Sequence, residues 1–136
     1  MPYAIMIDIY RYTHSHVDAV EPDSALSITI TSSPYSLQEG ERFTLTCTAN
    51  KSLHLQNTPS VNWYDGMGNQ IVNDENIRVG HLAESSDGMV MKTLTFDSLD
   101  RSHTMQYRCN ATITFHPPPY VMSKEAIWDL VVQGEQ

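Results

Sequence analysis

Two cysteines and a tryptophan constrain this chain more than any other feature. Trp63 follows Cys47 by 16 residues, and Cys109 follows Trp63 by 46 residues. Each of the three lies in a segment where apolar and polar residues alternate, which predicts a β-strand with one buried face. In each segment the cysteine or tryptophan falls on the apolar, inward side. The cysteine spacing by itself fits a disulfide, two free thiols or half of a metal site equally well.

The same alternation runs through most of the chain and predicts short strands without a helix of useful length. We expect strands at 26–31, 42–48, 61–64, 77–79, 89–96, 106–112 and 126–132. Seven or more short strands separated by turns predict an all-β fold, a two-sheet antiparallel sandwich. Its core is expected to include Leu45, Trp63, Leu94, Phe96 and Tyr107.

The first 24 residues show no sustained period and are interpreted as an N-terminal arm or linker (1–24) before a single domain at 25–134. A chain of 136 residues has room for one such domain. The start, Met1 to Tyr12, carries Asp8 and Arg11 and lacks a cleavage site, so it is not interpreted as a signal peptide. The apolar segment Tyr3 to Ile9 could instead be the last strand of a preceding domain.

The charge of the chain excludes one class of partner. Its net charge is −8, from 16 acidic and 8 basic residues, without a cluster of lysines and arginines. Binding to nucleic acid is therefore not expected, and an acidic surface also disfavours anionic membranes. No run reaches the roughly 18 to 20 consecutive apolar residues that a spanning helix requires.

From about Ala25 to Gly134 the chain resembles the immunoglobulin superfamily, in its intermediate or variable type. The matching segments are 40–47 with Cys47, 61–64 with Trp63, 94–96 with Leu99, 107–109 with Tyr107 and Cys109, and 130–132. The resemblance implies a Cys47–Cys109 disulfide that joins the two sheets beside Trp63, and a Tyr107 hydroxyl bonded to nearby backbone. Such a bridge closes a loop of about 60 residues, worth on the order of 4 kcal/mol, and needs an oxidising compartment.

The chain departs from the family pattern before Tyr107, where His103 and Met105 replace the usual aspartate and glycine. The missing aspartate usually pairs with an arginine whose position Arg78 matches. We therefore expect either that Asp100 takes over this ion pair or that the pair is absent.

Two sequons for N-glycosylation, at Asn50 and Asn110, become meaningful if the chain passes through the secretory pathway. Asn50 leaves a predicted strand into a loop. Asn110 has outward parity within a predicted strand, so a glycan there would partly mask that sheet face.

Two patches are candidates for binding. The first is the predicted loop from Phe115 to Tyr120, which includes His116 and Pro118 and whose prolines favour a stiff aromatic tip. Alternatively, its aromatic rings pack onto the sandwich while the prolines block edge pairing. The second patch is Asn62, Tyr64 and Arg108, on the outer face of two predicted strands.

Nothing in the sequence predicts catalysis or a cofactor. No Gly-x-Ser-x-Gly motif is present, and no free cysteine remains if the bridge forms. His14 and His16 have a spacing that metals use, but no third ligand lies nearby, so a solvated linker is the preferred interpretation and no metal is expected.

As the resemblance implies, the expected function is an extracellular or cell-surface recognition or adhesion module. Its partner would be a protein, which could be another copy of the chain, and not a small-molecule substrate. The alternative is a structural spacer in a multidomain ectodomain, with no binding site of its own.

Overall fold

Nine strands and one turn of 3₁₀ helix make up the part of the chain that the computed structural model describes. That part comprises residues 4–11, 26–33, 36–51, 58–85, 87–115 and 120–134, with the backbone alone at 4–11, 51, 115 and 120. In chain order the elements are β1 (Ala4–Arg11), β2 (Leu26–Ser32), β3 (Phe43–Lys51), β4 (Ser60–Tyr64), β5 (Ile77–Val79), β6 (Ala83–Glu84), β7 (Met89–Phe96), η1 (Arg101–His103), β8 (Met105–Phe115) and β9 (Tyr120–Leu130).

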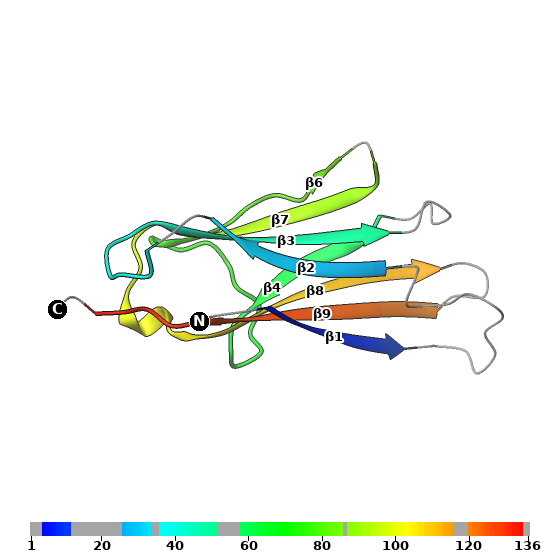
Figure 1. Cartoon of the computed structure of the whole chain (residues 1–136). Coiled ribbons are helices and arrows are strands. Elements are labelled where there is room, and N and C mark those ends of the chain that lie inside the picture. The colour runs from blue at the N-terminus through cyan, green and yellow to red at the C-terminus, as the bar shows by residue number, and fades with distance from the viewer. Residues whose placement is uncertain are drawn as a thin grey trace.

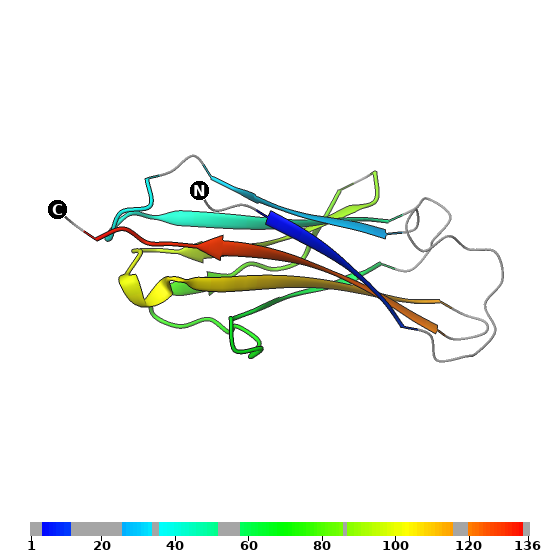
Figure 2. The same cartoon turned by 60° about the horizontal axis from the view of Figure 1, so that its bottom comes forward.

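The strands form two antiparallel sheets packed face to face. One sheet has the order β1-β9-β8-β4, and the other has the order β2-β3-β7-β5, with β6 also paired to β7. Figure 1 shows the two layers, and Figure 2 shows β1 running obliquely across β9. The prediction of an all-β two-sheet antiparallel sandwich is confirmed.

Alternation places the apolar side chains between the sheets. In β2, Leu26, Ile28 and Ile30 are buried while Ser27, Thr29 and Thr31 are exposed. Branched side chains that pack against one face and hydroxyls that meet water on the other stabilise a half-buried strand. The five residues expected in the core are all buried; they are Leu45, Trp63, Leu94, Phe96 and Tyr107.

After β2 the chain crosses from one sheet to the edge of the other. The amide of Glu39 donates to the carbonyl of Gln133 (3.0 Å), and the amide of Gln133 donates to the carbonyl of Leu37 (2.7 Å), in a parallel bridge beyond the end of β9. Gly40, at φ 87°, then turns the chain back into β3. This conformation is one that residues with a Cβ seldom adopt.

Residues 4–11 form a strand, which differs from the interpretation of residues 1–24 as an arm or linker. β1 pairs antiparallel with β9 along its whole length, from Ala4 opposite Trp128 to Arg11 opposite Val121. The alternative interpretation of Tyr3 to Ile9 as the last strand of a preceding domain shares the strand with the structure, but β1 pairs with β9 of this domain. In the sequence, Ile5, Ile7 and Ile9 alternate with a mixture of apolar and charged residues. Period-2 analysis therefore gives no clear polar face.

β9 is also longer than predicted. It begins at Tyr120 instead of Ala126 and pairs with β8 back to Phe115. Lys124 obscures the alternation in the added segment, since it lies on the inward side and is only 2% exposed.

The expectation that Arg78 pairs with Asp100, or with no acidic residue, is wrong. Its Nε lies 2.9 Å from Oδ2 of Asp97, whereas the Asp100 carboxylate accepts from the amide of Ser102 and caps η1. Strand register explains why Arg78 pairs with Asp97. Arg78 lies opposite Thr95, close to the end of β7, and Asp97 follows directly after that strand. The side chain of Arg78 is 70% exposed, so this pair contributes at most about 1 kcal/mol.

Candidate functional site

A disulfide joins the two sheets at the centre of the sandwich. Cys47 of β3 and Cys109 of β8 are bonded, and both are fully buried. Trp63 of β4 lies directly opposite Cys109 in the neighbouring strand. The predicted pairing is therefore confirmed, and no free cysteine remains among the described residues.

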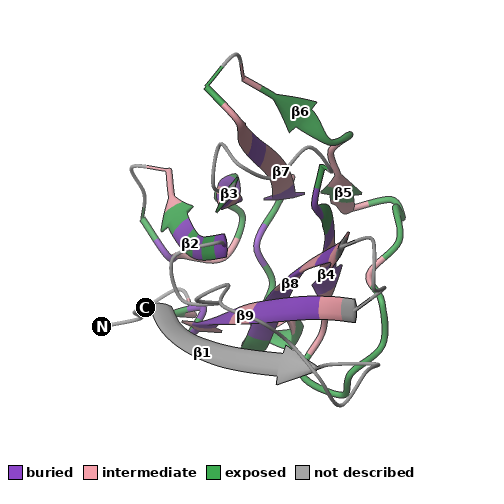
Figure 3. Cartoon of the chain, turned by 90° about the vertical axis from the view of Figure 1, so that its right-hand side faces the viewer, coloured by how far each residue is buried: buried purple, intermediate pink, exposed green. Residues whose placement is uncertain are grey.

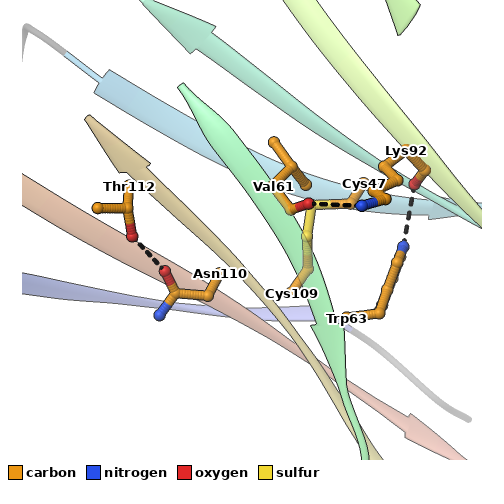
Figure 4. Close-up of a disulfide and its surroundings, with 7 residues drawn as sticks. All are labelled: Cys47, Val61, Trp63, Lys92, Cys109, Asn110 and Thr112. Atoms are coloured by element: carbon orange, nitrogen blue, oxygen red, sulfur yellow. Dashed lines mark hydrogen bonds between the residues drawn. A yellow bond between two sulfur atoms is a disulfide. The ribbon is translucent and has the colours of Figure 1, made fainter. Parts of the chain in front are cut away.

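Lys92 of β7 links the sheets beside this disulfide, and sequence analysis missed it. Its carbonyl accepts from the indole Nε1 of Trp63 (3.0 Å), and its ammonium donates to the carbonyl of Val61 (3.1 Å), as Figure 4 shows. Lys92 lies opposite Cys47 and so has inward parity. The sequence does show that Lys92 has the same parity as Leu94 and Phe96, which predicts an inward position. A lysine is usually exposed, however, so this parity alone does not indicate burial.

Tyr107 anchors the turn that leads into β8. Its hydroxyl donates to the carbonyl of His103 (2.7 Å), as expected for a tyrosine at this position, and its ring meets Phe96 edge-on at 5.3 Å. Burial raises the pKa of the Tyr107 phenol well above its ordinary value, and the charge of Asp65 adds to the rise. The phenol therefore remains a hydrogen-bond donor at physiological pH.

The turn before Tyr107 is held by a reciprocal pair of hydrogen bonds. The Asp100 carboxylate accepts from the amide of Ser102, and the amide of Asp100 donates to Nδ1 of His103 (2.9 Å). The hydrogen bonds that Asp100 accepts, first from the Ser102 hydroxyl and then from its amide, lower the pKa of this carboxyl. Burial lowers the pKa of His103, against a smaller opposing effect of the charges of Asp100 and Asp74. A neutral imidazole is what Nδ1 needs to accept a hydrogen bond.

The second predicted patch comes together on the outward face of β4 and β8. Tyr64 lies opposite Arg108, and Asn62 lies opposite Asn110, and all four are half-buried. Nη1 of Arg108 lies 3.4 Å from Oε1 of Glu125 on β9. We call Asn62, Tyr64, Arg108 and Asn110 the β4–β8 face. It offers an aromatic ring, a guanidinium and two amides on a rigid sheet.

The two sequons occupy opposite sheets. Asn50 is exposed at the end of β3, while Asn110 lies within the β4–β8 face, where its Oδ1 accepts from the hydroxyl of Thr112 (2.9 Å). Figure 4 shows this contact, which points away from the disulfide. Ser52, which completes the first sequon, lies outside the described residues.

The first predicted patch is described only through its backbone. Phe115 and Tyr120 pair with each other at the end of the β8–β9 hairpin. Their side chains, together with His116 and Pro118, lie outside the described part of the chain, and so do His14 and His16. The structure therefore places the tip at the hairpin end and leaves its aromatic contacts as a prediction.

Among the described residues, no three histidine, cysteine, aspartate or glutamate side chains gather in a way that could hold a metal ion. In the same residues, no helix has the length and apolar character to cross a membrane.

Comparison with known families agrees with this geometry. A family model described as an immunoglobulin domain matches residues 27–112. The chain belongs to the immunoglobulin domain family. No curated protein matches it. Immunoglobulin domains are generally non-enzymatic modules that commonly mediate protein–protein interaction, and a disulfide-linked one is typical of extracellular or cell-surface proteins.

Proposed function

We propose that this immunoglobulin domain is an extracellular recognition module that binds a protein partner through the β4–β8 face and the adjoining hairpin tip. The observation that carries the proposal is the Tyr64–Arg108 pair, which register places side by side on the outer face of the sheet. Tyrosine and arginine are enriched where protein interfaces derive most of their binding energy.

The surroundings of this pair support a binding role. Both side chains are half-buried, so part of their conformational entropy is already lost before a partner arrives. Glu125 lies near the guanidinium of Arg108 and limits its freedom further. A partner with a carboxylate and an apolar edge would complement this face.

Passage through the secretory pathway is part of the proposal. The buried disulfide requires an oxidising compartment to form, and two sequons are consistent with secretion. The β4–β8 face offers amides, a phenol and a guanidinium, which are groups suited to contact with a protein surface.

The test is a binding screen with the full chain secreted from animal cells and multimerised on a fluorescent carrier. It is applied to cells that display extracellular domains, this chain among them. We expect the Tyr64→Ala/Arg108→Ala variant to lose at least about tenfold in binding. Phe115→Ala/Tyr120→Ala is the corresponding variant of the hairpin tip.

The matched control is Thr29→Ala/Thr48→Ala, a directly opposed pair on the other sheet. It should bind like the wild type. Equal binding by the Tyr64→Ala/Arg108→Ala variant and the control would contradict the proposed face. Absence of any partner would favour a structural spacer.

A further inference from the structure

β9 is buried on its inward face and in part on its outward face, although it lies only one strand from the edge of its sheet. On the inward side Met122, Lys124 and Ala126 are nearly inaccessible, and on the outward side Ser123 and Ile127 are also buried. Figure 3 shows this burial along β9. An outer sheet face next to an edge is usually solvated in antiparallel sandwiches, so β9 is enclosed to an unusual degree.

Only one strand covers the free edge of β9 within the sheet. β1 supplies this cover through eight paired positions, and within the described part of the chain β9 is the strand with which it pairs. Residues 12–25 connect it to β2, which lies in the opposite sheet. The family match ends at residue 112, so neither β1 nor β9 belongs to the matched region. β1 is thus attached to the domain as an added edge strand.

The enclosed strand carries a lysine on its core side. Lys124 is 2% exposed and lies between Met122 and Ala126 on the inward face. A buried ammonium is tolerated only when an opposite charge or several hydrogen bonds compensate for the water it has lost.

The register of the added strand places an acidic residue opposite Lys124. Across β8 the residue opposite Lys124 is Ala111, whereas across β1 it is Asp8. A slip of β1 by two residues would keep the same residues on each side of the strand. It would bring Met6 or Tyr10 opposite Lys124 and place Asp8 opposite Met122 or Ala126, respectively. The acidic residue at position 8 therefore distinguishes the observed register from its nearest alternatives.

The register also fixes the positions of three isoleucines of β1. Ile5 lies opposite Ile127, and Ile7 and Ile9 lie opposite Glu125 and Ser123. An extended segment that fits this edge needs branched apolar residues at alternate positions on one side and a carboxylate at a fixed position on the other.

We propose that the edge of β9 is a binding site for an extended peptide strand. Lys124 is its selectivity residue, and β1 is the occupant that the chain itself supplies. The main chain of the ligand extends the sheet, and its carboxylate neutralises the buried ammonium, as in other cases where a strand is added to a sheet edge. This site is distinct from the β4–β8 face and does not depend on the proposed function.

The experiment separates the strand from the domain after folding. A protease site is inserted after residue 18 of the full chain, which is folded, oxidised and then cut. The probe is a fluorescent synthetic peptide of residues 1–12, and its uptake is measured by fluorescence anisotropy. A second probe carries Asp8→Asn, which preserves shape and removes the charge. Intact chain is the control, since a tethered strand competes at high effective concentration.

We expect the cut protein to take up the wild-type peptide and to bind the Asp8→Asn peptide at least about tenfold more weakly. The intact chain should take up neither. In a Lys124→Met acceptor, which replaces the charge with an apolar side chain of similar length, the preference for Asp8 should disappear. Equal binding of both peptides to the Lys124 protein would overturn the assignment of selectivity. Failure of the cut protein to bind either peptide would overturn the site itself.

Discussion

A single side chain, His103, connects the end of one sheet to the start of the other. Its Nδ1 accepts from the amide of Asp100, its ring lies 5.0 Å from that of Phe96, and its carbonyl accepts from Tyr107. Immunoglobulin domains usually have an aspartate here. The histidine serves instead as the partner of Asp100 in the capping of η1, while Asp97 pairs with Arg78.

The stability of the domain should therefore depend on the protonation of His103. Burial holds the pKa of His103 below its ordinary value of 6.5, so the folded state resists protonation more than the unfolded chain does. The stabilising contribution is present above pH 6.5 and is lost as the pH falls through the lowered folded pKa. We expect His103→Gln, whose amide oxygen can still accept from Asp100, to weaken this dependence.

Urea unfolding of the wild type and His103→Gln at several pH values between 7.5 and 5 measures the effect. The variant should lose less stability over this interval than the wild type. Identical slopes of unfolding free energy against pH in the two proteins would show that another group is responsible.

The contribution of Tyr107 to stability should fall as the pH rises into the alkaline range, whereas that of His103 falls as the pH decreases. Tyr107→Phe removes the hydrogen bond to His103 and should cost about 1 kcal/mol at neutral pH. Because burial raises the folded pKa of Tyr107, its contribution is present below the ordinary value of 10.0 and is lost as the pH rises above it. The difference in free energy of unfolding between wild type and Tyr107→Phe, measured by urea unfolding, should narrow above pH 10. A constant gap up to pH 11 would contradict this assignment.

Sequence analysis found the residues whose role follows from local pattern and missed those whose role depends on register. Cys47, Trp63 and Tyr107 are apolar or weakly polar residues at inward positions, and their partners are set by strand parity. Lys92 and Lys124 also have inward positions, but a charged residue there signals exposure until the neighbouring strand is known. Likewise, the pairing of β5 with β7 brings Asp97 close to Arg78, and this pairing cannot be seen in the local sequence pattern.

Whole strands were also predicted where the local pattern is clear and missed where it is not. The strands β2, β3, β4, β7 and β8 have one apolar and one polar face, and all were predicted within a few residues. β1 and the first half of β9 depart from that pattern. In β9, Lys124 stands on the inward side and Ser123 on the outward side is buried. In β1, Ile5, Ile7 and Ile9 alternate in the sequence with a mixture of apolar and charged residues, so neither segment gives a clear polar face.

The covalent link between β3 and β8 should account for a large part of the stability. Replacing both cysteines, as Cys47→Ala/Cys109→Ala, releases a loop with a sequence separation of 62 residues and should cost about 4 kcal/mol in the chain-entropy model. The two cavities left in the core add to this cost. Thermal and urea unfolding of the oxidised wild type and the variant give the difference, and a loss below about 1 kcal/mol would contradict the prediction.

The connection between β5 and β6 passes close to β7 and requires a glycine. A Cβ at position 80 would clash with Oγ1 of Thr93. We expect Gly80→Ala to destabilise the domain by about 1–3 kcal/mol, because Thr93 is stiff and cannot move aside easily. Thr93→Ala removes the obstructing oxygen, so the double variant should recover much of the loss. Additive losses in the double variant, measured by thermal unfolding, would exclude this steric cause.

At the scale of the whole molecule, the two outer sheet faces differ in chemistry. The β2–β3 face carries a series of threonines and ends near the exposed Asn50, whereas the β4–β8 face presents Tyr64 and Arg108 with Asn110 beside them. A glycan on Asn50 would leave the second face open. A glycan on Asn110 would stand between a protein partner and the Tyr64–Arg108 pair.

Removal of the second sequon should therefore strengthen partner binding. In the cell-binding screen we expect Asn110→Gln, secreted from animal cells, to bind severalfold more tightly than the wild type, because the neighbouring Asn62 and Arg108 become accessible. Asn50→Gln is the matched control, since it removes a glycan from the opposite sheet, and it should bind like the wild type. Mass spectrometry of the secreted proteins shows which asparagine carries a glycan in each case. If both variants bind more tightly by the same factor, the glycans act through their bulk alone. If Asn110→Gln loses binding while its fold is retained, the amide or its glycan is itself part of the contact. In that case the prediction that a glycan on Asn110 masks the Tyr64–Arg108 pair is wrong.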